Sequence, residues 1–366
     1  IYDNIGKGNS IASLLVYDAE KKSTDPRNVK ITESKTYTAG KPVLGVIGAG
    51  NFTGSTILPK LKAAGAQIKS IASSKGLNGS TQAKKHSIEN STTDYKGILA
   101  DSEINTVLVT TQHGSHAMFV SEALESDKHV FVEKPITLTP GDAEIAYKEA
   151  KKNNRVLAVG FNRRFHPNFI KIQEMINSNE LGKVIHIEGT INAPGLWMYD
   201  PNGWRSKASE TPAGGMTGMG IHVIDQMIAT AGSVDNLYAQ TAKIIRNGEL
   251  DEVTSVLFKF NNGITGYLGT SIATAMYYCF RVFAENGCVE INERDLSVLK
   301  YTPREGEIVS TKVENINTVR DELECFANTI NGNATYPVTS EDGIHGIEVF
   351  DAVIRSAKDK NIVFIK

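Results

Sequence analysis

The fold is decided by the stretch Val43-Leu-Gly-Val-Ile-Gly-Ala-Gly-Asn-Phe-Thr-Gly54. Its apolar start predicts a buried strand, and the glycines after it predict a tight turn that opens a helix. Gly48 permits the turn, and Gly50 lets the backbone approach a pyrophosphate at the helix N-terminus. Asn51, Phe52 and Thr53 complete the loop, and Thr53 stands where a third glycine or alanine is usual. Because short glycine turns are common, the prediction of a dinucleotide site also depends on the strands and helices after the loop.

Strand and helix patterns alternate after this loop. Continuous apolar strands separated by helices predict a parallel sheet covered on both faces, the doubly wound α/β arrangement of a Rossmann domain, which we assign to residues 42–162. Pro59 lies beyond the first turn of the first helix and predicts a kink. The expected strands are Val43–Ile47, Ile68–Ala72, Thr106–Thr110, His129–Val132 and Val156–Phe161, and the expected helices include Ser55–Ala64, His116–Ser126 and Gly141–Lys152.

The rhythm changes after about Asn162, and residues 163–366 predict a second domain of the α+β class. Asn-Gly between alternating runs is a hairpin signal, and it recurs here before an antiparallel meander. The hairpins join Val253–Phe260 to Ile264–Ser271 and Tyr278–Glu285 to Val289–Asn292. Further expected elements are the helices Phe169–Ser178, Val319–Ile330 and Gly343–Lys358, the strand Val184–Ile191 and a glycine-rich segment, Gly214–Gly220.

Residues 1–41 stand apart from both domains. The apolar run Ile11–Tyr17 predicts one strand, and the polar stretch through Gly40 predicts a linker. One strand cannot bury its own faces, so this segment must pack on something else. We expect an N-terminal extension or the remnant of an upstream domain, and the start at Ile1 leaves a removed leader open.

The composition excludes several classes of protein. A net charge of −2 without a basic run argues against nucleic-acid and anionic-membrane partners. No apolar stretch approaches the ~20 residues of a membrane span. The three cysteines, Cys279, Cys288 and Cys325, form no CxxC pair. We therefore expect reduced thiols, no metal site and a cytoplasmic location.

The end of the second strand bears on the choice of cofactor. An NAD site usually places Asp or Glu there to bind the ribose hydroxyls. This chain has Ser73, Ser74 and Lys75 instead, which offer donors and a positive charge to a 2′-phosphate. The sequence therefore predicts NADP or NAD with NADP favoured, against the alternative of an ordinary polar turn.

Polar side chains also follow later strands, at the sheet edge where ligands bind in open α/β folds. Lys134, in Glu133-Lys134-Pro135, can bind a substrate hydroxyl, and partial desolvation can lower its pKa. We expect Glu133 and Lys134 to contact the cofactor as well. The alternative is an ordinary surface lysine. Thr110, Thr111, His113 and His116 follow another strand, and for them we favour cofactor contact or a helix start over a metal pair.

Two further segments supply candidate ligands. Asn162, Arg163 and Arg164 follow the last Rossmann strand. We expect Asn162 to contact the substrate. We expect one of the two arginines, Arg163 or Arg164, to contact the cofactor or an acidic group of the substrate; the alternative is a salt bridge between the domains. Trp204 and Arg205 lie in a loop that holds both tryptophans of the chain. Aromatic faces stack on sugar rings and arginine grips hydroxyls or carboxylates, so we expect substrate contact there, against a role in an oligomer interface.

Taken in order and spacing, Gly48-Ala-Gly50, Glu133-Lys134-Pro135, Gly160-Phe-Asn-Arg-Arg-Phe165 and Gly214–Gly220 with His222-Val-Ile-Asp225 are similar to one family. Residues 42–366 resemble the glucose–fructose oxidoreductase / inositol dehydrogenase / MocA family. The resemblance implies a Rossmann domain followed by a domain with an open, mostly antiparallel sheet. It also implies redox chemistry on sugars and polyols with NAD or NADP, in homodimers or homotetramers formed through that sheet. Residues 1–41 resemble the end of a zinc-type alcohol dehydrogenase domain, as in bi-domain oxidoreductases.

Carried over residue by residue, the resemblance makes Lys134 the lysine that contacts substrate and cofactor and His222 the general acid/base. A histidine suits that role because its unperturbed pKa lies near neutrality; a packed helix histidine is the alternative. Asp225, one helical turn on, is a candidate for substrate binding or for packing alone. Many members carry an aspartate four residues before the histidine, where this chain has Gly218.

These observations leave three hypotheses. The favoured one is hydride transfer between NAD(P) and a hydroxyl or carbonyl of a sugar, polyol or sugar derivative. The second is redox-assisted elimination or glycoside cleavage, in which tightly held NAD is regenerated within one turnover. The third is a dinucleotide-binding sensor without turnover, which the glycine at position 218 favours.

Overall fold

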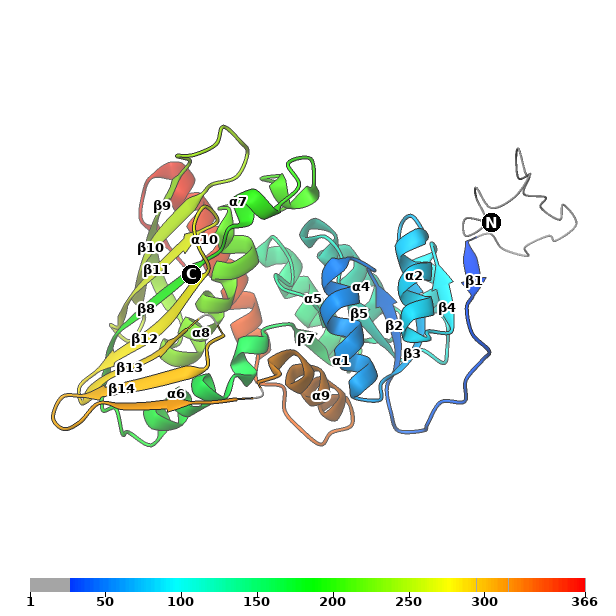
Figure 1. Ribbon diagram of the computed structural model, residues 1–366, viewed down its shortest axis with the longest axis horizontal. Helices are drawn as coiled ribbons and strands as arrows, with labels where there is room; N and C mark the ends of the chain where they lie inside the picture. Colours follow the sequence, from blue (N-terminus) through cyan, green and yellow to red (C-terminus); the bar gives the residue numbers. More distant parts are fainter. Residues whose placement is uncertain (1–26, 294, 315, 366) are drawn as a thin grey trace, which may run out of the picture.

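The computed structural model describes residues 27–293, 295–314 and 316–365. They form two sheets that lie side by side with helices between and around them (Figure 1). The expected strand Ile11–Tyr17 lies outside the described residues. The first sheet has seven strands in the order β1-β4-β3-β2-β5-β6-β7, and all its neighbours are parallel except β1 and β4.

The elements of the first domain follow the predicted alternation, and the predicted Rossmann fold is confirmed. Its strands are β1 (Asn28–Lys30), β2 (Val43–Ile47), β3 (Gln67–Ala72), β4 (Asn90–Thr92), β5 (Thr106–Val109), β6 (His129–Val132) and β7 (Leu157–Val159). Its helices are the π-helical turn η2 (Thr53–Ile57), α1 (Leu58–Ala63), α2 (Leu77–His86), α3 (Tyr95–Ala100), the 3₁₀ turn η3 (His113–Ser115), α4 (His116–Glu125) and α5 (Pro140–Lys152).

Two details of this domain differ from the sequence expectations. Strand β1 falls in the stretch expected to be a linker, where it pairs with the edge strand β4. The kink expected at Pro59 takes the form of the π-helical turn η2, after which the proline occupies the first turn of α1. The helical run is continuous from residue 51 to residue 63, so Pro59 lies inside it. A proline removes one backbone N–H from such a run, and the π-helical turn just before it is the accompanying irregularity.

The second sheet has nine strands in the order β15-β14-β13-β12-β8-β11-β10-β9-β16. Its neighbours are antiparallel except β8 and β11, which confirms the predicted mostly antiparallel sheet. The strands are β8 (Val184–Asn192), β9 (Val234–Ala242), β10 (Val253–Phe260), β11 (Thr265–Ser271), β12 (Tyr277–Ala284), β13 (Gly287–Asn292), β14 (Val298–Pro303), β15 (Val309–Lys312) and β16 (Val363–Phe364).

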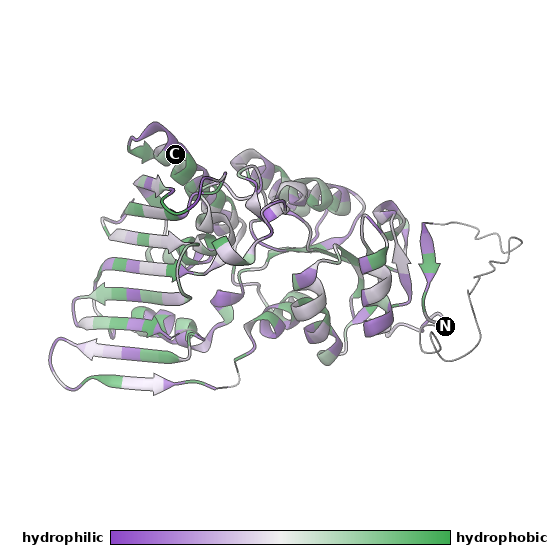
Figure 2. Ribbon diagram, turned by 45° about the horizontal axis from the view of Figure 1, so that its top comes forward, coloured by the Kyte–Doolittle hydropathy of each residue, from purple (hydrophilic) through white to green (hydrophobic). Residues whose placement is uncertain are grey.

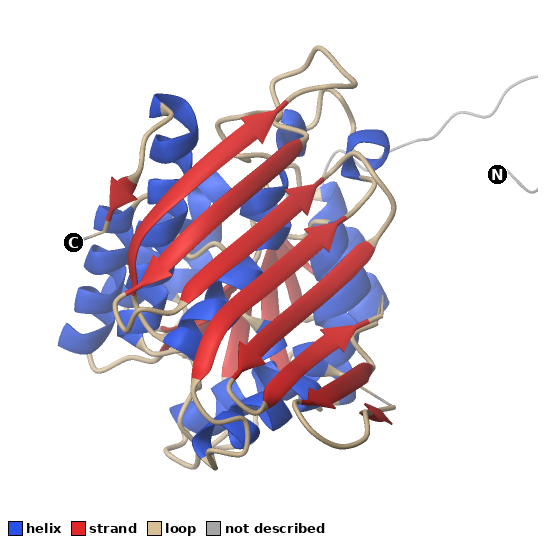
Figure 3. Ribbon diagram, turned by 90° about the vertical axis from the view of Figure 1, so that its left-hand side faces the viewer, coloured by secondary structure: helices blue, strands red, loops and turns tan. Residues whose placement is uncertain are grey.

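One face of this sheet is covered and the other is open. Figure 3 looks onto the open face, with the helices behind it. Polar and apolar residues alternate along the strands (Figure 2), as expected when one face packs on a core. The helical segments are η4 (Asn162–Phe165), α6 (Pro167–Asn177), α7 (Gly195–Met198), η5 (Trp204–Ser206), the π-helical turn η6 (Met216–Gly220), α8 (Ile221–Ala231), α9 (Thr318–Ile330) and α10 (Ser340–Asp359).

Helices α8 and α9 carry site residues to the place where the two domains meet. Helix α8 is buried along almost its whole length, between β8, α10 and η4. Helix α9 follows eight of the nine strands of the second sheet in the chain but packs beside α1 and η4 (Figure 1). There the ring of Phe326 lies 5.7 Å from that of Phe131 on β6, measured between centroids. Residues distant in sequence therefore converge where the two domains meet.

Candidate active site

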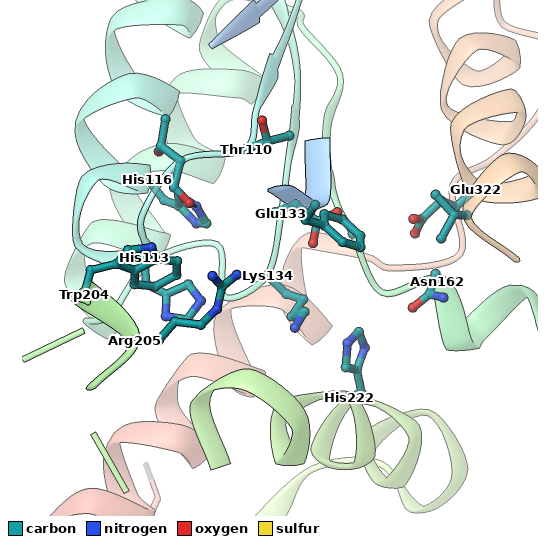
Figure 4. A pocket seen from close by; sticks show the side chains of 14 residues that line it. Thr110, His113, His116, Glu133, Lys134, Asn162, Trp204, Arg205, His222 and Glu322 are labelled. Atoms are coloured by element: carbon teal, nitrogen blue, oxygen red, sulfur yellow. Dashed lines mark hydrogen bonds between the residues drawn. The ribbon is translucent and has the colours of Figure 1, made fainter. Parts of the chain in front are cut away.

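A cavity of about 210 Å³ lies at the carboxyl edge of the parallel sheet, where the two domains meet. Ligands bind at this edge in open α/β folds because the loops after successive strands converge there. Figure 4 shows side chains from both domains pointing into the cavity. Its lining comprises Phe52, Thr110, Thr111, His113, His116, Glu133, Lys134, Gly160, Asn162, Trp204, Arg205, His222, Val319 and Glu322.

The glycine loop after β2 has the geometry that a dinucleotide needs. Gly48 has a φ of +113°, and a Cβ there would lie 2.7 Å from the carbonyl of Thr110, so the position accepts only glycine. A Cβ at Gly50 would meet nothing within 4 Å, which leaves the backbone open to a ligand. The helical run that contains η2 begins at Asn51, directly after Gly50. The loop therefore fits a pyrophosphate bound at a helix N-terminus.

Thr53, the departure from the usual glycine pattern, has a structural role. Its side chain is buried, and its hydroxyl donates to Oγ1 of Thr110 over 2.8 Å. The Thr110 hydroxyl lies 3.1 Å from the carbonyl oxygen of Gly48. Thr53 thus ties the glycine loop to the end of β5, and Phe52 and Thr110 are the neighbours that reach the cavity.

The turn after β3 carries the three residues expected at the cofactor ribose. Ser74 and Lys75 are exposed. The Ser73 hydroxyl already has one partner within the protein, because its Oγ accepts a hydrogen bond from the Gly79 amide over 3.0 Å. None of the three lines the central cavity. The turn has no carboxylate, so its open groups are two hydroxyls and an ammonium.

The two histidines after β5 are held by backbone groups. Nδ1 of His113 donates to the carbonyl oxygen of Glu210 over 2.7 Å, and Nδ1 of His116 donates to that of Pro135 over 2.7 Å. Burial lowers the pKa of His113 to about 3 and lowers the pKa of His116 as well. Both imidazole rings are therefore uncharged where they line the cavity. Within the described part of the chain, no three His, Cys, Asp or Glu side chains cluster as metal ligands.

The loop with both tryptophans closes one side of the cavity. The indole of Trp204 meets the ring of His113 edge to face, with centroids 4.9 Å apart. The guanidinium of Arg205 stacks on the same indole at 4.2 Å. These contacts bring a second-domain arginine beside Lys134 of the first domain (Figure 4).

Lys134 lies at the centre of the cavity with its amine withdrawn from bulk water. Its Nζ donates a 2.6 Å hydrogen bond to the carbonyl oxygen of Gly218 in η6. Burial lowers the pKa of Lys134, although its neighbour Glu133 favours the charged form. An amine placed in this way can give a hydrogen bond to a substrate oxygen and respond to the charge that develops there.

His222 faces Lys134 from the first turn of α8 and is 9% exposed. Its Nδ1 is buried without a hydrogen-bond partner, so Nε2 is the nitrogen left to face the cavity. Burial, followed by the charges of Lys134 and Arg163, lowers the pKa of His222 well below its usual value. The imidazole is therefore neutral near pH 7 and can accept a proton. A Cβ at Gly218, one turn earlier, would meet nothing within 4 Å.

Glu322 is a site residue that the sequence reasoning missed. It lies on α9, is 1% exposed, and its Oε2 has no hydrogen-bond partner. Burial, with the nearby charge of Glu133, raises the pKa of Glu322, and burial raises the pKa of Glu133 to about 7. The signal was a carboxylate on the apolar face of α9, beside Leu323 and Phe326, but only the return of α9 to the first domain brings it to the cavity.

Two expected ligands do not reach the cavity. Arg164, expected at the cofactor, and Asp225, expected at the substrate, form a bidentate ion pair with both contacts at 2.8 Å. Arg164 also contacts Asp342 of α10 at 3.0 Å. All three side chains belong to the second domain, so these ion pairs lie within that domain and are not the interdomain bridge considered as the alternative. Asn162, by contrast, does line the cavity, and its Nδ2 donates to the Thr318 hydroxyl over 2.7 Å.

Comparison with known proteins agrees with this geometry. Residues 43–161 match the model of the oxidoreductase family with an NAD-binding Rossmann fold (GFO/IDH/MocA), and residues 169–290 match that of the GFO/IDH/MocA C-terminal domain. Residues 1–41 lie outside both ranges, so their likeness to an alcohol dehydrogenase stays a prediction. None of the described helices combines the length and the apolar character required to cross a membrane.

Similar proteins include two curated dehydrogenases. D-xylose 1-dehydrogenase (NADP(+)) 2 from Haloferax volcanii is 24% identical over 86% of this chain and 97% of its own length. Myo-inositol 2-dehydrogenase from Thermotoga maritima is 25% identical over 76% of this chain and 85% of its own length. Among solved structures, a levoglucosan dehydrogenase in complex with NADH superposes with a TM-score of 0.80 at 21% identity, over 89% of this chain and 99% of that one. This last likeness supports the fold alone.

Proposed function

We propose that this chain, which belongs to the GFO/IDH/MocA family of oxidoreductases with an NAD-binding Rossmann fold, moves a hydride between a nicotinamide dinucleotide and a hydroxyl-bearing carbon of a sugar, polyol or sugar derivative. One observation carries the proposal. Lys134 and His222, which come from different domains, meet in the cavity next to the glycine loop. We infer that both act on one substrate oxygen, Lys134 as hydrogen-bond donor and His222 as neutral base.

The two side chains divide the proton chemistry of alcohol oxidation. The ammonium of Lys134 binds the substrate hydroxyl and stabilises negative charge on its oxygen. Neutral His222 takes the hydroxyl proton on Nε2, and the bound dinucleotide supplies the hydride acceptor. In the reverse direction, protonated His222 returns that proton to the carbonyl oxygen. Because Nδ1 of His222 has no carboxylate partner, only packing against Phe161 and neighbouring side chains orients the imidazole.

The residues that would hold the dinucleotide belong to the first domain. The backbone of Gly48, Gly50 and Asn51 accommodates the pyrophosphate, and Phe52 and Thr110 reach the nicotinamide end of the cavity. At the other end, we assign the ribose to Ser73, Ser74 and Lys75. Two hydroxyls and an ammonium in place of a carboxylate favour a 2′-phosphate, and therefore NADP over NAD.

A sugar or polyol suits the part of the cavity that the second domain lines. The indole of Trp204 offers the sugar an aromatic surface, and the guanidinium of Arg205 stacked on it offers N–H donors to hydroxyl groups. The side-chain amide of Asn162 also lines the cavity. The named xylose and inositol dehydrogenases among the relatives support this class of substrate. On this assignment, residues 42–162 bind the dinucleotide and residues 163–366 bind the substrate, with Lys134 and Asn162 of the first domain completing the substrate site.

We assign the open face of the nine-stranded sheet to contact between subunits in a homodimer or homotetramer. Large apolar side chains are exposed on its strands, among them Ile185 on β8 and Leu257 on β10. Exposed apolar side chains gathered on one face are typical of an interaction site. Light scattering at two protein concentrations measures the assembly, and a monomer at both would refute the assignment.

The function is tested by binding followed by turnover. Fluorescence titration with NADPH and NADH should give saturable binding, tighter for NADPH. A panel of sugars, polyols and sugar acids with the oxidised dinucleotide should then yield reduced nicotinamide in solution. Tightly retained cofactor without net release would favour redox-assisted elimination. Binding without any turnover, unchanged by Lys134→Ala, would favour a sensor.

A further inference from the structure

A second cavity of about 190 Å³ adjoins the first at His222. It lies between the covered face of the nine-stranded sheet and the π-helical turn η6. Arg163, Gly218 and Tyr278 are among the residues that line it with His222. A substrate whose hydroxyl sits between Lys134 and His222 can extend its next atoms into this second cavity. The groups around the second cavity therefore bear on which substrates fit.

The guanidinium of Arg163 is a cation without a matching anion. It lies over the ring of Tyr278 at 4.3 Å, and its Nη1 is buried without a hydrogen-bond partner. No carboxylate of the described residues forms an ion pair with it. The next residue, Arg164, is paired with both Asp225 and Asp342. A buried cation normally has such a partner, because an unpaired charge is costly to remove from water.

Other positive charges near Arg163 make the binding of an anion beside it more favourable. Lys134, Arg163 and Arg205 all approach the site, and their charges disfavour one another. The carboxyl groups of Glu133 and Glu322 offset this positive charge only in part. Burial raises the pKa of each and so favours the protonated, uncharged form. His166 offers one more donor near Arg163: it lines a neighbouring cavity with it, and its buried Nε2 has no partner.

The helix beside the cavity leaves room for an anion. Position 218 lies one turn before His222, facing the same cavity, and as glycine it carries no side chain. A Cβ there would meet no atom within 4 Å. At this cavity the protein thus presents a cation, the unpartnered Nδ1 of His222 and an empty position, and the lining contains no carboxylate. Asp295 and Glu314 line the neighbouring cavity with Arg163, but neither forms an ion pair with it.

We infer that the substrate supplies this charge: it is a sugar acid whose carboxylate binds Arg163, with the oxidised hydroxyl held between Lys134 and His222. The inference rests on the proposed function and narrows its substrate class. In the oxidation, the hydroxyl proton passes to His222, the carbon-bound hydrogen leaves with its electron pair to the oxidised dinucleotide, and a carbonyl forms. The carboxylate keeps its charge throughout. Its negative charge near His222 favours the imidazolium that forms, as a protein carboxylate would.

Matched pairs of compounds test the inference. D-gluconate and D-glucitol differ by one carboxylate, as do D-glucuronate and D-glucose. With the dinucleotide-loaded protein, we expect the acids to bind at least about tenfold more tightly by calorimetry, and to give the higher kcat/KM, since hydrogen bonds between charged groups are the strong ones. Arg163→Met should abolish this preference, and Arg163→Lys should keep part of it because the charge remains without the fork.

The control is Arg355→Met, which removes an exposed arginine on α10 and should leave the preference unchanged. Equal binding of acid and neutral compound to the wild type, or an acid preference that survives in Arg163→Met, would overturn the inference while leaving hydride transfer intact. Acid-selective binding without reduced nicotinamide from any compound would instead overturn the proposed function. If Arg163→Met does not fold, Arg163→Lys provides the test. An undiminished preference for acids in that variant would contradict recognition of the carboxylate by the guanidinium of Arg163.

Discussion

Asp225→Asn should destabilise the fold without altering the chemistry of the site. Asp225 is 3% exposed and holds Arg164, 8% exposed, through two contacts of 2.8 Å. Although burial alone would lower it, the Asp225 carboxylate raises the pKa of Arg164. Removing one partner of a buried ion pair costs about 3–5 kcal/mol. We expect the lower end, about 3 kcal/mol, because Asp342 still contacts the guanidinium at 3.0 Å.

Urea denaturation measures this loss, and thermal denaturation should show a Tm lower by about 6–12 °C. The matched control is Asp351→Asn, which breaks the exposed pair with Arg355 and should cost less than about 1 kcal/mol. At temperatures where the variant stays folded, KM for the substrate should be unchanged. A wild-type Tm together with a tenfold higher KM would contradict this assignment, since it would place Asp225 in the substrate site.

Further predictions concern the cavity itself. His222→Asn should lower kcat about 10²–10⁴-fold in steady-state assays, with dinucleotide affinity retained; equal loss of both would indicate a packing role. Because burial and neighbouring cations lower the pKa of His222, the base is already neutral at pH 6.5. kcat/KM for oxidation should therefore fall only as the pH drops below that value, and a decline beginning above pH 7 would contradict this. Gly48→Ala places a Cβ 2.7 Å from the Thr110 carbonyl and should weaken dinucleotide binding at least about tenfold in a fluorescence titration. Lys75→Glu should reverse any preference for NADPH over NADH, and an unchanged ratio of dissociation constants would remove Lys75 from the ribose site.

The parts of the site that the sequence predicted are those that local rules control. The loop at Gly48 and Gly50 follows from a buried strand and a helix start, and Lys134 follows from its place after another buried strand. Both patterns are contained within a dozen residues. The confirmed strands of the first sheet share this property, because continuous apolar runs between helices have few alternative arrangements.

The parts that the sequence did not predict depend on packing between distant segments. Glu322 becomes a site residue only because α9 returns to the first domain. Arg163 and Arg164 are adjacent, yet one faces a cavity and the other an ion pair, which spacing alone cannot distinguish. Asp225 is one turn from His222 but pairs with Arg164 and does not line the cavity.

Short and edge strands escaped prediction for a related reason. Strand β1 has three exposed residues, so it has no apolar pattern to recognise. Its position is determined by pairing with β4, itself three residues long. Strand β15 is exposed throughout and is ordered by its pairing with β14. Such strands depend on backbone hydrogen bonds to a neighbour, which hydrophobic periodicity does not report.

Hydride transfer at Lys134 and His222 can be followed with an isotope label on the hydride itself. A sugar acid deuterated at the oxidised carbon is incubated with the protein and NADP⁺, and the released cofactor is analysed by mass spectrometry. We predict that reduced cofactor from the wild type carries the deuterium and that Lys134→Met forms little of it. Dinucleotide bound to the wild type, with no deuterium transferred from any member of a panel of deuterated sugars, polyols and sugar acids, would contradict hydride transfer at this site.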